Sequence, residues 1–431
     1  MSISVVILAA GQGTRMKSDT PKVLHKISGK SMLFYAIDAA LEVSDDITVV
    51  LYHQQKRIQQ AIEENYHNNI KFHIQDVENF PGTGGAMRGV SVEYERVVIL
   101  NGDMPLVTQE SIMALSDGEG DINMSVIELD DPMGYGRVAI QDNHVQEIIE
   151  EKDCTEVQKA IKSVNAGVYA LTKEVLDSFI PRLSNDNAQQ EYYLTDIIKM
   201  GVDEGKSINP IYVQEAEFKG VNSKLDLANA ELIMQRQIKE ELMKSGVIMR
   251  LPDTIYIDAR AEFEGEVILE NGVSIEGHSI IKSSHIKTNS VVEDSIITNS
   301  SIGPLARIRP NSHLLDTHIG NFVEVKKSTL NGVKAGHLSY LGDSIIEEGT
   351  NIGAGVITCN YDGKNKHRTK IGKNVFVGSD SQLVAPIIIE DDVIIGAGST
   401  INQDIKQGEL AISRSPIKRV KNFFYKFFGK K

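Results

Sequence analysis

The residues near the N-terminus have the types and spacing of an anion-binding turn. The segment VVILAAGQGTR, residues 5–15, joins an apolar run to a glycine-rich turn, and Lys22 follows it. Gly11 and Gly13 let backbone amides approach an anion closely, while Arg15 and Lys22 can neutralise phosphate charge. The segment lacks the third glycine of a dinucleotide fingerprint and the Gly-Lys-Ser/Thr of a P-loop. It predicts a phosphate-binding loop of another kind, with a purely structural strand-to-helix turn as the alternative.

A second group of residues that could do chemistry surrounds a histidine in the C-terminal half. His337 lies in the segment AGHLSYLGD, residues 335–343, which also holds Tyr340, and Arg309 and Lys326 precede it. An imidazole titrates at about pH 6.5, so a histidine suits the role of general base. A lone histidine is more often an ordinary surface or core residue. The neighbouring cations and the tyrosine favour a site here.

The elements that must carry the first group alternate between strand and helix. Apolar runs predict buried strands, and helical patterns lie between these runs. The strands are expected at residues 4–10, 47–52, 97–100 and 123–128, and helices at residues 31–42 and 56–64, among others. This alternation predicts an α/β domain, Rossmann-like, with a mostly parallel sheet. Such sheets bind ligands at the carboxyl ends of their strands.

The elements that must carry the second group repeat every six residues. Aliphatic residues recur at this interval in two series: Ile296, Ile302, Ile308 and Leu314, then Ile371, Val377, Leu383, Ile389, Ile395 and Ile401. The period predicts a three-sided left-handed parallel β-helix, because each side takes one hexapeptide and its aliphatic residue fills the interior. The repeat weakens between residues 330 and 371. Residues 337–343 and 360–369 are therefore expected to be loops that build a binding face.

A helix is predicted between the two halves. Ser223 suits a helix N-cap and Gly246 a C-terminal stop, with an imperfect helical stripe of apolar residues between them. We therefore expect an α/β domain at residues 1–222, a linker helix at 223–246, and a β-helix domain with a C-terminal tail at 247–431.

The glycine-rich segment LAAGQGTRM, followed by PKVL, resembles the signature of the sugar-1-phosphate nucleotidyltransferases. More of that family's pattern follows in order, at Gln75, Pro81-Gly82-Thr83, Asn101-Gly102-Asp103, Gly134-Tyr135-Gly136-Arg137, Glu150-Glu151-Lys152, Asn165-Ala166-Gly167 and Gly220-Val221-Asn222. The resemblance implies a set of residues around UTP and the sugar nucleotide: Leu8, Ala9, Ala10, Gly11, Lys22, Gln75, Gly82, Thr83, Gly136, Glu150, Asn165 and Asn222. The chain departs from the pattern at Asn101, where a tyrosine is common, and at Gly84-Gly85, which replaces Ala-His.

A magnesium site is expected beside this nucleotide site. Nucleotidyl transfer needs a cation to offset the triphosphate charge and to align the attack on the α-phosphorus. Asp103 follows a predicted strand and offers the hard oxygen that Mg²⁺ prefers, although an aspartate in such a place is more often a cap. The resemblance implies that Asp103 and Asn222 hold Mg²⁺ and that Arg15 and Lys22 stabilise the developing charge.

With a β-helix after the nucleotidyltransferase domain, the chain resembles the bacterial family of bifunctional N-acetylglucosamine-1-phosphate uridyltransferase/glucosamine-1-phosphate acetyltransferases. The resemblance covers the chain up to the C-terminal tail. The motifs that carry it in the second half are RIRP at 307–310, GNFVEVKK at 320–327, AGHLSYLGD at 335–343, NIGAG at 351–355 and TCNYDG at 358–363.

The resemblance to this bifunctional family implies roles in the β-helix domain. His337 would be the general base. Glucosamine 1-phosphate would be bound by Arg309, Lys326, Tyr340 and Asn351, and acetyl-CoA by Ala354, Asn360, Tyr361, Ser379, Ala397 and Arg414. The β-helix is expected to form a homotrimer, with coenzyme A in a groove between subunits. Cys359 lies in the cleft motif, but its spacing implies no base partner, so we interpret it as a packed thiol.

We expect two consecutive reactions. The chain would acetylate glucosamine 1-phosphate with acetyl-CoA and then transfer UMP from UTP to the product, giving UDP-N-acetylglucosamine and pyrophosphate for cell-wall and lipopolysaccharide synthesis. One alternative is a monofunctional nucleotidyltransferase whose β-helix is structural or regulatory. Another is a sugar-nucleotide-binding module without enzymatic activity.

Composition limits the remaining possibilities. The 431 residues are 41% hydrophobic and 24% charged, which excludes disorder over most of the chain. A net charge of −14 argues against general nucleic-acid binding. Cys154 and Cys359 are too few and too far apart for a disulfide framework or a cysteine metal site. Without a signal-peptide pattern or a long apolar run, a cytoplasmic location and no stable membrane insertion are expected.

The C-terminal tail has a composition of its own. Residues 414–431 carry seven Lys or Arg, no Asp or Glu, and the run FFYKFF at 423–428. A basic, aromatic end could dock on anionic lipid. The alternative is a tail packed on the β-helix or on a neighbouring subunit.

Overall fold

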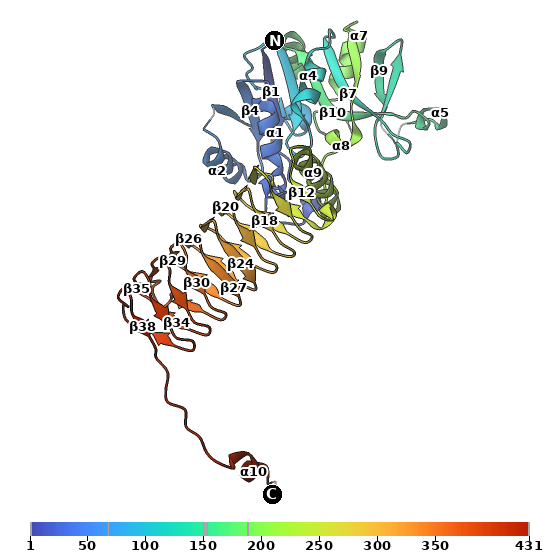
Figure 1. The fold of residues 1–431 in the computed structure, drawn as a ribbon. Coiled ribbons are helices and arrows are strands. Elements are labelled where there is room, and N and C mark those ends of the chain that lie inside the picture. The colour runs from blue at the N-terminus through green and yellow to red at the C-terminus, as the bar shows by residue number, and fades with distance from the viewer. Residues whose placement is uncertain (1, 68, 150, 152–153, 188, 430–431) are drawn as a thin grey trace. The chain divides into compact units, whose positions relative to one another are not determined.

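A computed structural model describes residues 2–67, 69–149, 151, 154–187 and 189–429 (Figure 1). The chain divides into two compact units, Met1–Met234 and Gln235–Lys431. The division falls within helix α9 (Lys224–Lys244).

The first unit is built on a mixed sheet whose strands run in the order β11-β7-β10-β6-β1-β4-β5. Its strands are β1 (Ile3–Leu8), β4 (Asp46–Leu51), β5 (Ile70–Ile74), β6 (Arg96–Asn101), β7 (Ile122–Glu128), β10 (Ser163–Thr172) and β11 (Ile208–Tyr212), with the hairpin β8 (Arg137–Gln141) and β9 (His144–Ile149) attached to β10. Strands β4, β5 and β6 are parallel to β1, whereas β10 is antiparallel to β6 and β7. The predicted α/β fold with a mostly parallel sheet is confirmed.

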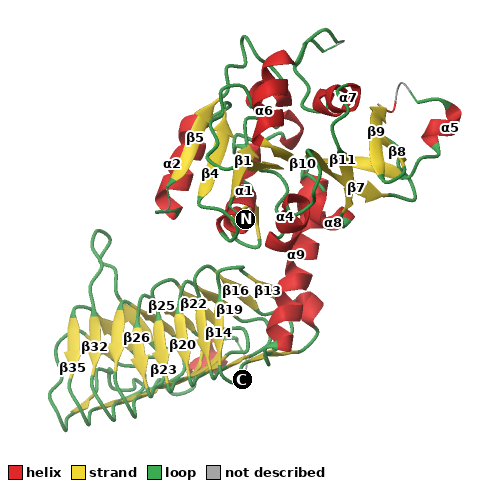
Figure 2. Ribbon diagram, turned by 90° about the horizontal axis from the view of Figure 1, so that it is seen from above, coloured by secondary structure: helices red, strands yellow, loops and turns green. Residues whose placement is uncertain are grey.

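Helices cover both faces of this sheet (Figure 2). One apolar cluster joins it to α1 (Met32–Leu41), α2 (Gln55–Asn65) and α4 (Gln109–Ser116), and another joins it to α6 (Lys173–Phe179) and α7 (Asp196–Asp203). Strand β1 supplies both clusters because alternate side chains point to opposite faces of a strand, with Val5 in the first and Val6 in the second. Shorter elements are β2 (Lys26–Ile27), β3 (Lys30–Ser31), α3 (Thr83–Ala86), α5 (Glu156–Lys159), α8 (Glu215–Phe218) and the 3-10 turns Thr14–Met16, Lys22–Leu24 and Ile180–Arg182.

Helix α9 begins and ends where its capping residues predict. The backbone amide of Asp226 donates to Ser223 Oγ at 3.2 Å, and the Ser223 amide donates to the Asp226 carboxylate at 2.8 Å. This reciprocal pair satisfies amides of the first turn. At the other end Gly246 has φ +107°, and the Val247 amide donates to the Leu242 carbonyl at 3.0 Å, which is the Schellman pattern of a helix C-terminus.

The second unit is a left-handed parallel β-helix in which three sheets form the sides of a prism. The first sheet contains β12 (Ile248–Met249), β15 (Ile268–Leu269), β18 (His285–Ile286), β21 (Ser301–Ile302), β24 (His318–Asn321), β27 (Lys334–His337), β30 (Asn351–Ile352), β33 (Phe376–Val377), β36 (Ile394–Ile395) and β38 (Leu410–Ala411). The second contains β13 (Tyr256–Ile257), β16 (Ser274–Glu276), β19 (Val291–Glu293), β22 (Arg307–Arg309), β25 (Glu324–Lys326), β28 (Tyr340–Gly342), β31 (Ile357–Cys359), β34 (Gln382–Val384) and β37 (Thr400–Ile401). The third contains β14 (Glu262–Glu264), β17 (Ile280–Lys282), β20 (Ile296–Thr298), β23 (His313–Leu315), β26 (Thr329–Asn331), β29 (Ser344–Ile346), β32 (Thr369–Ile371) and β35 (Ile387–Ile389), and the 3-10 turn Pro252–Thr254 precedes β13.

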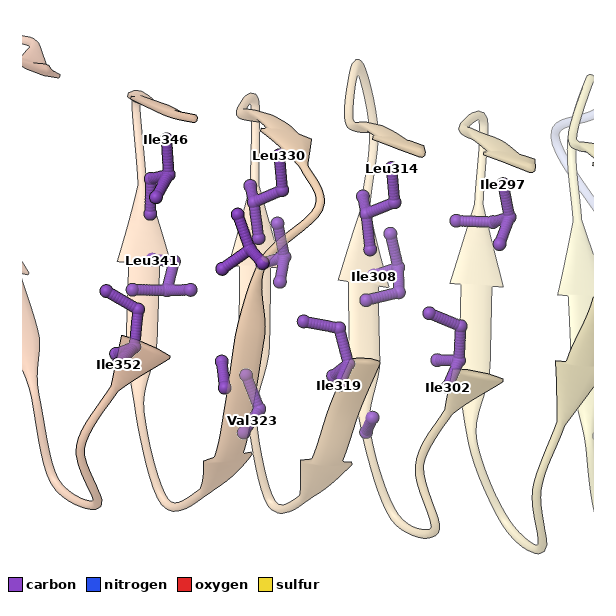
Figure 3. Packing of buried hydrophobic residues seen from close by; sticks show 14 of the residues in the cluster. Ile297, Ile302, Ile308, Leu314, Ile319, Val323, Leu330, Leu341, Ile346 and Ile352 are labelled. Carbon is purple, nitrogen blue, oxygen red and sulfur yellow. The ribbon is translucent and has the colours of Figure 1, made fainter. Parts of the chain in front are cut away.

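The interior of the prism is filled mainly by one aliphatic residue from each strand, joined by corner residues such as Val323 (Figure 3), while Thr358 takes the interior position in β31. Our sequence interpretation placed Ile296 among them, and this was wrong: Ile297 is fully buried and Ile296 is only half-buried. The spacing explains the error. Ile302 pairs with Ile319 on the next coil, so this coil takes seventeen residues, whereas Ile371 pairs with Ile389, eighteen residues on. The coils around Ile296 have shorter corners, whereas the coils from Ile371 to Ile401 keep three hexapeptides.

One of the two expected loops is regular coil instead. Residues 337–343 contain the end of β27 and all of β28, both paired in their sheets, so His337 does not lie in a repeat-breaking loop. The weakened repeat reflects Ala335 filling the interior where other coils have a larger aliphatic. The second loop is present, because β31 ends at Cys359 and β32 begins at Thr369.

The chain ends in an exposed segment with the short helix α10 (Phe423–Phe427). Among the described helices, none combines the length and the apolar character that crossing a membrane requires.

Candidate active sites

A cavity of about 490 Å³ lies at the carboxyl ends of β1 and β6. Eight of the residues predicted to surround the nucleotide line it together: Leu8, Ala9, Ala10, Gly11, Lys22, Gln75, Gly82 and Thr83. The sheet positions the first of them directly, since Ala9 donates its amide to the Val50 carbonyl at 2.9 Å and Gly102 donates to the Leu8 carbonyl at 2.9 Å. Two parallel neighbours of β1 therefore fix the loop that leaves it.

The glycine-rich turn makes room for a lysine. Gly13 has φ +62°, and a Cβ at this position would lie 2.5 Å from the Lys22 Cβ. Only glycine combines this left-handed backbone with so close an approach. The turn thus brings the Lys22 side chain back toward the end of β1.

The far wall of the cavity is a loop held by a buried glutamine. Gln75 is 6% exposed, and its amide donates to the carbonyls of Phe80 at 3.0 Å and Gly82 at 2.9 Å. Gly82 has φ +92°, and a Cβ there would lie 2.6 Å from the Tyr192 carbonyl oxygen. A Cβ on Gly85 would lie 2.0 Å from the Phe80 carbonyl oxygen. This crowding explains why the chain has glycine where the nucleotidyltransferase pattern has a larger residue.

A charged centre lies at one edge of the cavity. The Lys22 ammonium forms an ion pair with Asp103 and donates to the Asn222 amide oxygen at 2.7 Å, while Arg15 donates to the same oxygen at 2.8 Å. Lys22 and Asp103 are 13% and 20% exposed, so the pair is partly shielded from water. Arg15 and Lys22 follow β1, Asp103 follows β6, and Asn222 follows α8, and all four meet here.

A second cavity of about 390 Å³ shares Asn101 and Asp103 with the first. Arg15, Asn165 and Asn222 line it as well. The two cavities therefore form adjoining halves of one cleft, with the charged centre where they meet.

The charged centre fits a magnesium ion. Among the described residues no group of three or more His, Cys, Asp or Glu side chains is arranged to bind a metal. Mg²⁺ does not require one, because it is commonly bound through one or two protein oxygens, substrate phosphates and waters. The Asp103 carboxylate and the Asn222 amide oxygen both accept from the Lys22 ammonium, so the two oxygens already converge on a cation.

Gly136 and Glu150 are the remaining predicted sugar-nucleotide residues. The Gly136 carbonyl accepts from the Asn165 amide at 3.1 Å, which places it beside the second cavity. Glu150 lies outside the described residues.

An ion pair that we did not predict as part of the site supports this region. Arg137, 2% exposed, pairs with Glu151 at 2.6 Å, and the Gly134 amide donates to the same carboxylate at 3.1 Å. The Arg137 guanidinium and then the Gly134 amide lower the pKa of Glu151. The motif Gly134-Tyr135-Gly136-Arg137 was the available signal, but only its Gly136 was assigned a role.

In the second unit, His337 begins a column of residues on successive coils. Ala335, Ile352, Val377 and Ile395 pair in sequence along one sheet. Two positions after each of them, the chain reaches the same corner of the prism. The residues at this corner are His337, Ala354, Ser379 and Ala397. The proposed base and three of the proposed acetyl-CoA residues therefore form one line.

Backbone hydrogen bonds tie this corner column together. Gly355 donates to the His337 carbonyl at 3.4 Å, Asp380 to the Ala354 carbonyl at 2.7 Å, and Gly398 to the Ser379 carbonyl at 2.8 Å. The His337, Ser379 and Ala397 side chains are exposed. At the Ala397 end of the column, a Cβ on Gly398 would lie 3.7 Å from Arg414 Cδ, so Arg414 flanks the column. The corner is a narrow track of small side chains with a histidine at one end.

Cations gather on the sheet that follows His337. In the register of this sheet, Arg309 lies opposite Lys326 on the next coil, and Lys326 lies opposite Gly342 on the coil after that. Tyr340 lies over Gly342, because a Cβ there would be 2.5 Å from the tyrosine hydroxyl. Arg309 is held by Glu324 at 2.8 Å. An outward face of arginine, lysine and tyrosine on the sheet that follows His337 can bind a phosphate.

Lys366 joins this cluster from the inserted loop, and the sequence analysis missed it. Its ammonium lies close to that of Lys326 and lowers the pKa of Lys326, with burial and Arg309 acting in the same direction. Like charges held together in this way favour an anionic ligand. The loop at 360–369 was recognised in the sequence, but nothing in its composition showed that Lys366 turns toward Lys326.

The remaining predicted residues of this unit lie in different surroundings. Asn360 is 6% exposed, and its amide donates to the Asp343 carboxylate, which anchors the inserted loop. Tyr361 is exposed on that loop, and Asn351 lies on β30 of the first sheet. Burial raises the pKa of Cys359, which disfavours the thiolate and agrees with a packed thiol.

Comparisons with known proteins agree with both units. Residues 5–155 match the MobA-like NTP transferase domain, and residues 368–403 match the bacterial transferase hexapeptide (six repeats). The chain is 68% identical to the Bifunctional protein GlmU of a Sulfurovum species over all of both chains, and 59% identical to that of a Nitratiruptor species, again over all of both. The solved structure of HddC from Yersinia pseudotuberculosis is 25% identical with a TM-score of 0.38, covering 49% of this chain and 90% of its own.

Proposed function

The chain belongs to the GlmU family of bifunctional proteins, which makes it a uridyltransferase and a glucosamine-1-phosphate acetyltransferase, and we propose how its residues divide the two reactions. The uridyl transfer takes place in the cleft of the first unit. The acetyl transfer takes place at the His337 corner of the second.

In the first unit, UTP binds in the cavity that begins at the end of β1. The backbone of residues 8–11 and the loop held by Gln75 surround the nucleotide. The phosphate of N-acetylglucosamine 1-phosphate, bound in the adjoining cavity near Asn165 and Asn222, attacks the α-phosphorus. Lys22 and Arg15 stabilise the charge that develops, because cationic donors fixed in advance act most strongly where charge accumulates. Pyrophosphate leaves.

Asp103 and Asn222 would hold Mg²⁺ in this cleft. A bound Mg²⁺ offsets the negative charge of the triphosphate and aligns the in-line displacement. Lys22 contacts both oxygens in this structure, and its ammonium would be available to offset phosphate charge when Asp103 and Asn222 hold the ion.

In the second unit, glucosamine 1-phosphate binds with its phosphate against Arg309, Lys326 and Lys366. The amine attacks the carbonyl carbon of acetyl-CoA, whose pantetheine chain lies along the column Ala354, Ser379 and Ala397. His337 accepts the proton of the amine, the C–S bond breaks, and coenzyme A leaves as the thiol. No acyl-enzyme is needed, and the raised pKa of Cys359 agrees with direct transfer.

The β-helix associates into a homotrimer in this proposal. Its outer faces carry exposed apolar residues at regular positions, among them Ile357, Phe376 and Ile394. A second subunit covering such a face would complete the coenzyme A groove. Size-exclusion chromatography with light scattering should give three times the mass of 47.5 kDa, and a monomer would contradict this part.

The observation that carries the two-site proposal is the His337 column together with the cation cluster on the sheet that follows it. A β-helix that served only as a scaffold would have no need of a histidine and a track of small residues at one corner, or of three cations on the adjoining sheet. The test incubates the wild-type chain with acetyl-CoA and either glucosamine 1-phosphate or glucosamine, and follows thiol release. We expect rapid release with the phosphorylated sugar only. Release of no thiol would establish the monofunctional alternative.

The first unit has its own test. The chain should release pyrophosphate from UTP and N-acetylglucosamine 1-phosphate. Binding of the sugar nucleotide without any release of pyrophosphate would favour the alternative of a sugar-nucleotide-binding module without enzymatic activity.

A further inference from the structure

The C-terminal helix α10 presents an apolar face that no part of the described chain covers. At about 100° per residue, Phe423, Phe424, Phe427 and Phe428 fall within one arc of roughly 140°, while Tyr425 and Lys426 lie on the opposite side. The four phenylalanine side chains are between 56% and 69% exposed. Exposed large aromatics at this density are unusual on a water-facing surface and mark an interaction site.

Charge separates the tail from the rest of the chain. Residues 414–431 carry +7 because they contain seven Lys or Arg and no acid, and since the whole chain carries −14, residues 1–413 carry −21. Lys418, Arg419 and Lys421 directly precede the phenylalanine face, and Lys426 lies within the helix that carries it. A body of net negative charge is repelled by an anionic surface, whereas the tail is attracted to one.

We propose that residues 418–429 are an interfacial anchor that docks the chain on anionic phospholipid. A short apolar face alone binds a bilayer weakly, and so does a short basic stretch; the two together give stable but reversible docking. The phenyl rings enter the headgroup and upper acyl region, and the flanking lysines and arginine contact lipid phosphates. The docked helix lies on the membrane and does not cross it.

The ring geometry favours lipid over nucleic acid. Phe423 and Phe427 stack with centroids 5.7 Å apart, and Phe424 and Phe428 lie 4.8 Å apart. Their faces are turned partly toward each other, which hinders the stacking on bases that single-stranded nucleic acid requires. The ring edges remain free for acyl chains, which need no particular face.

A fluorescence experiment tests the docking on the full chain. The sequence contains no tryptophan, so Phe427→Trp creates a single reporter in the apolar face. Vesicles of phosphatidylcholine with 30% phosphatidylglycerol should shift its emission to the blue, while vesicles of phosphatidylcholine alone should not. No shift with the anionic vesicles would overturn the proposal. A blue-shifted emission that is already present without lipid and fades on dilution would also overturn it, because the tail would then pack on another copy.

Sedimentation with the same vesicles separates the apolar face from the charge. Replacing Phe424 and Phe428 by serine should lower vesicle binding by about tenfold or more. Tyr425→Ser, which removes a ring on the opposite side of the helix that meets Phe424 edge-on with centroids 5.7 Å apart, should leave vesicle binding within about twofold. Equal losses of vesicle binding in the two variants would contradict an anchor whose lipid contacts lie on one face of the helix. Tighter binding to single-stranded DNA than to the anionic vesicles would contradict the choice of lipid.

The anchor is distinct from both catalytic sites. Truncation after Ile417 keeps Arg414, removes the whole anchor and should abolish sedimentation with anionic vesicles. Pyrophosphate release and thiol release should both be unchanged, which shows that both units of the truncated chain are folded. Retained sedimentation of the truncated chain would locate the lipid contact elsewhere and overturn the proposal.

Discussion

At the residue scale, one lysine links the two oxygens of the charged centre in the uridyl-transfer cleft. Lys22 contacts both oxygens proposed to hold magnesium, and its side-chain stem lies against the glycine-rich turn. It therefore keeps Asp103 and Asn222 together before substrate binds and offsets phosphate charge afterwards. A neutral side chain of the same length would lose both effects.

Lys22→Met should lower the rate of pyrophosphate release by about 100-fold or more, the effect of removing one fixed donor from a developing charge. Thiol release from acetyl-CoA should stay at the wild-type rate. Lys26→Met is the matched control, because Lys26 is exposed on β2 nearby and its loss should change neither rate. Near-normal pyrophosphate release by the Lys22 variant would remove this residue from the reaction.

A second lysine defines the sugar-phosphate site. The Lys366 ammonium lowers the pKa of Lys326, and binding of a phosphate between these groups relieves their repulsion. Lys366→Met should raise the KM for glucosamine 1-phosphate by about tenfold while kcat changes little. Lys364→Met, an exposed position of the same loop, is the control and should leave the KM unchanged. A loss confined to kcat would assign Lys366 another role.

At the scale of elements, the hydrophobic spacing predicted the β-helix but not its register in every coil. The downstream series from Ile371 to Ile401 was correct because those coils contain three complete hexapeptides. Upstream, Ile297 replaces Ile296 because the corners there are shorter, and corner length leaves only a weak trace in the apolar pattern. Likewise, the interior residue Ala335 is small, so the apolar repeat is weak there. The regular strands around His337 were therefore predicted to be a loop.

The sites show the same division between what sequence can and cannot predict. Strand ends and motifs brought Lys22, Asp103 and Asn222 to one place correctly. The support of the site by Arg137 and Glu151, and the turn of Lys366 toward Lys326, depend on side-chain directions in irregular segments. No periodic pattern encodes those directions.

Glu270 stabilises the early coils of the β-helix. Hydrogen bonds from the Thr288 hydroxyl and amide, together with His285, lower its pKa from 4.5 to about 2 despite the opposing effect of burial. Because the folded-state pKa is depressed, the stabilisation is complete above about pH 4.5 and is lost as the pH falls toward 2.

Glu270→Gln should therefore lower the free energy of unfolding by about 1–2 kcal/mol at pH 7, allowing for partial solvent screening. The difference from wild type should narrow steadily below pH 4.5. Thermal unfolding followed by circular dichroism at pH 7 and pH 3.5 measures the difference in stability between variant and wild type at each pH. Glu264→Gln removes an exposed ion pair with Lys282 and should have almost no effect. A difference that stayed constant with pH would contradict the account.

At the scale of the whole molecule, the chain joins two units that each have their own apolar core. One cluster fills the prism of the β-helix, and two others lie on the faces of the nucleotidyltransferase sheet. No residue of one proposed site is shared with the other. The product of the acetyl transfer is the acceptor in the uridyl transfer, so the two reactions are consecutive in chemistry while their residues are separate.

The most direct test of this account measures both reactions in one preparation of His337→Ala. Thiol release from acetyl-CoA and glucosamine 1-phosphate should fall by at least about 100-fold, and pyrophosphate release from UTP and N-acetylglucosamine 1-phosphate should equal that of wild type. Equal loss of both activities would mean that the two sites do not act independently. Unchanged thiol release would mean that His337 is not the base, and the acetyl-transfer site would have to be placed elsewhere.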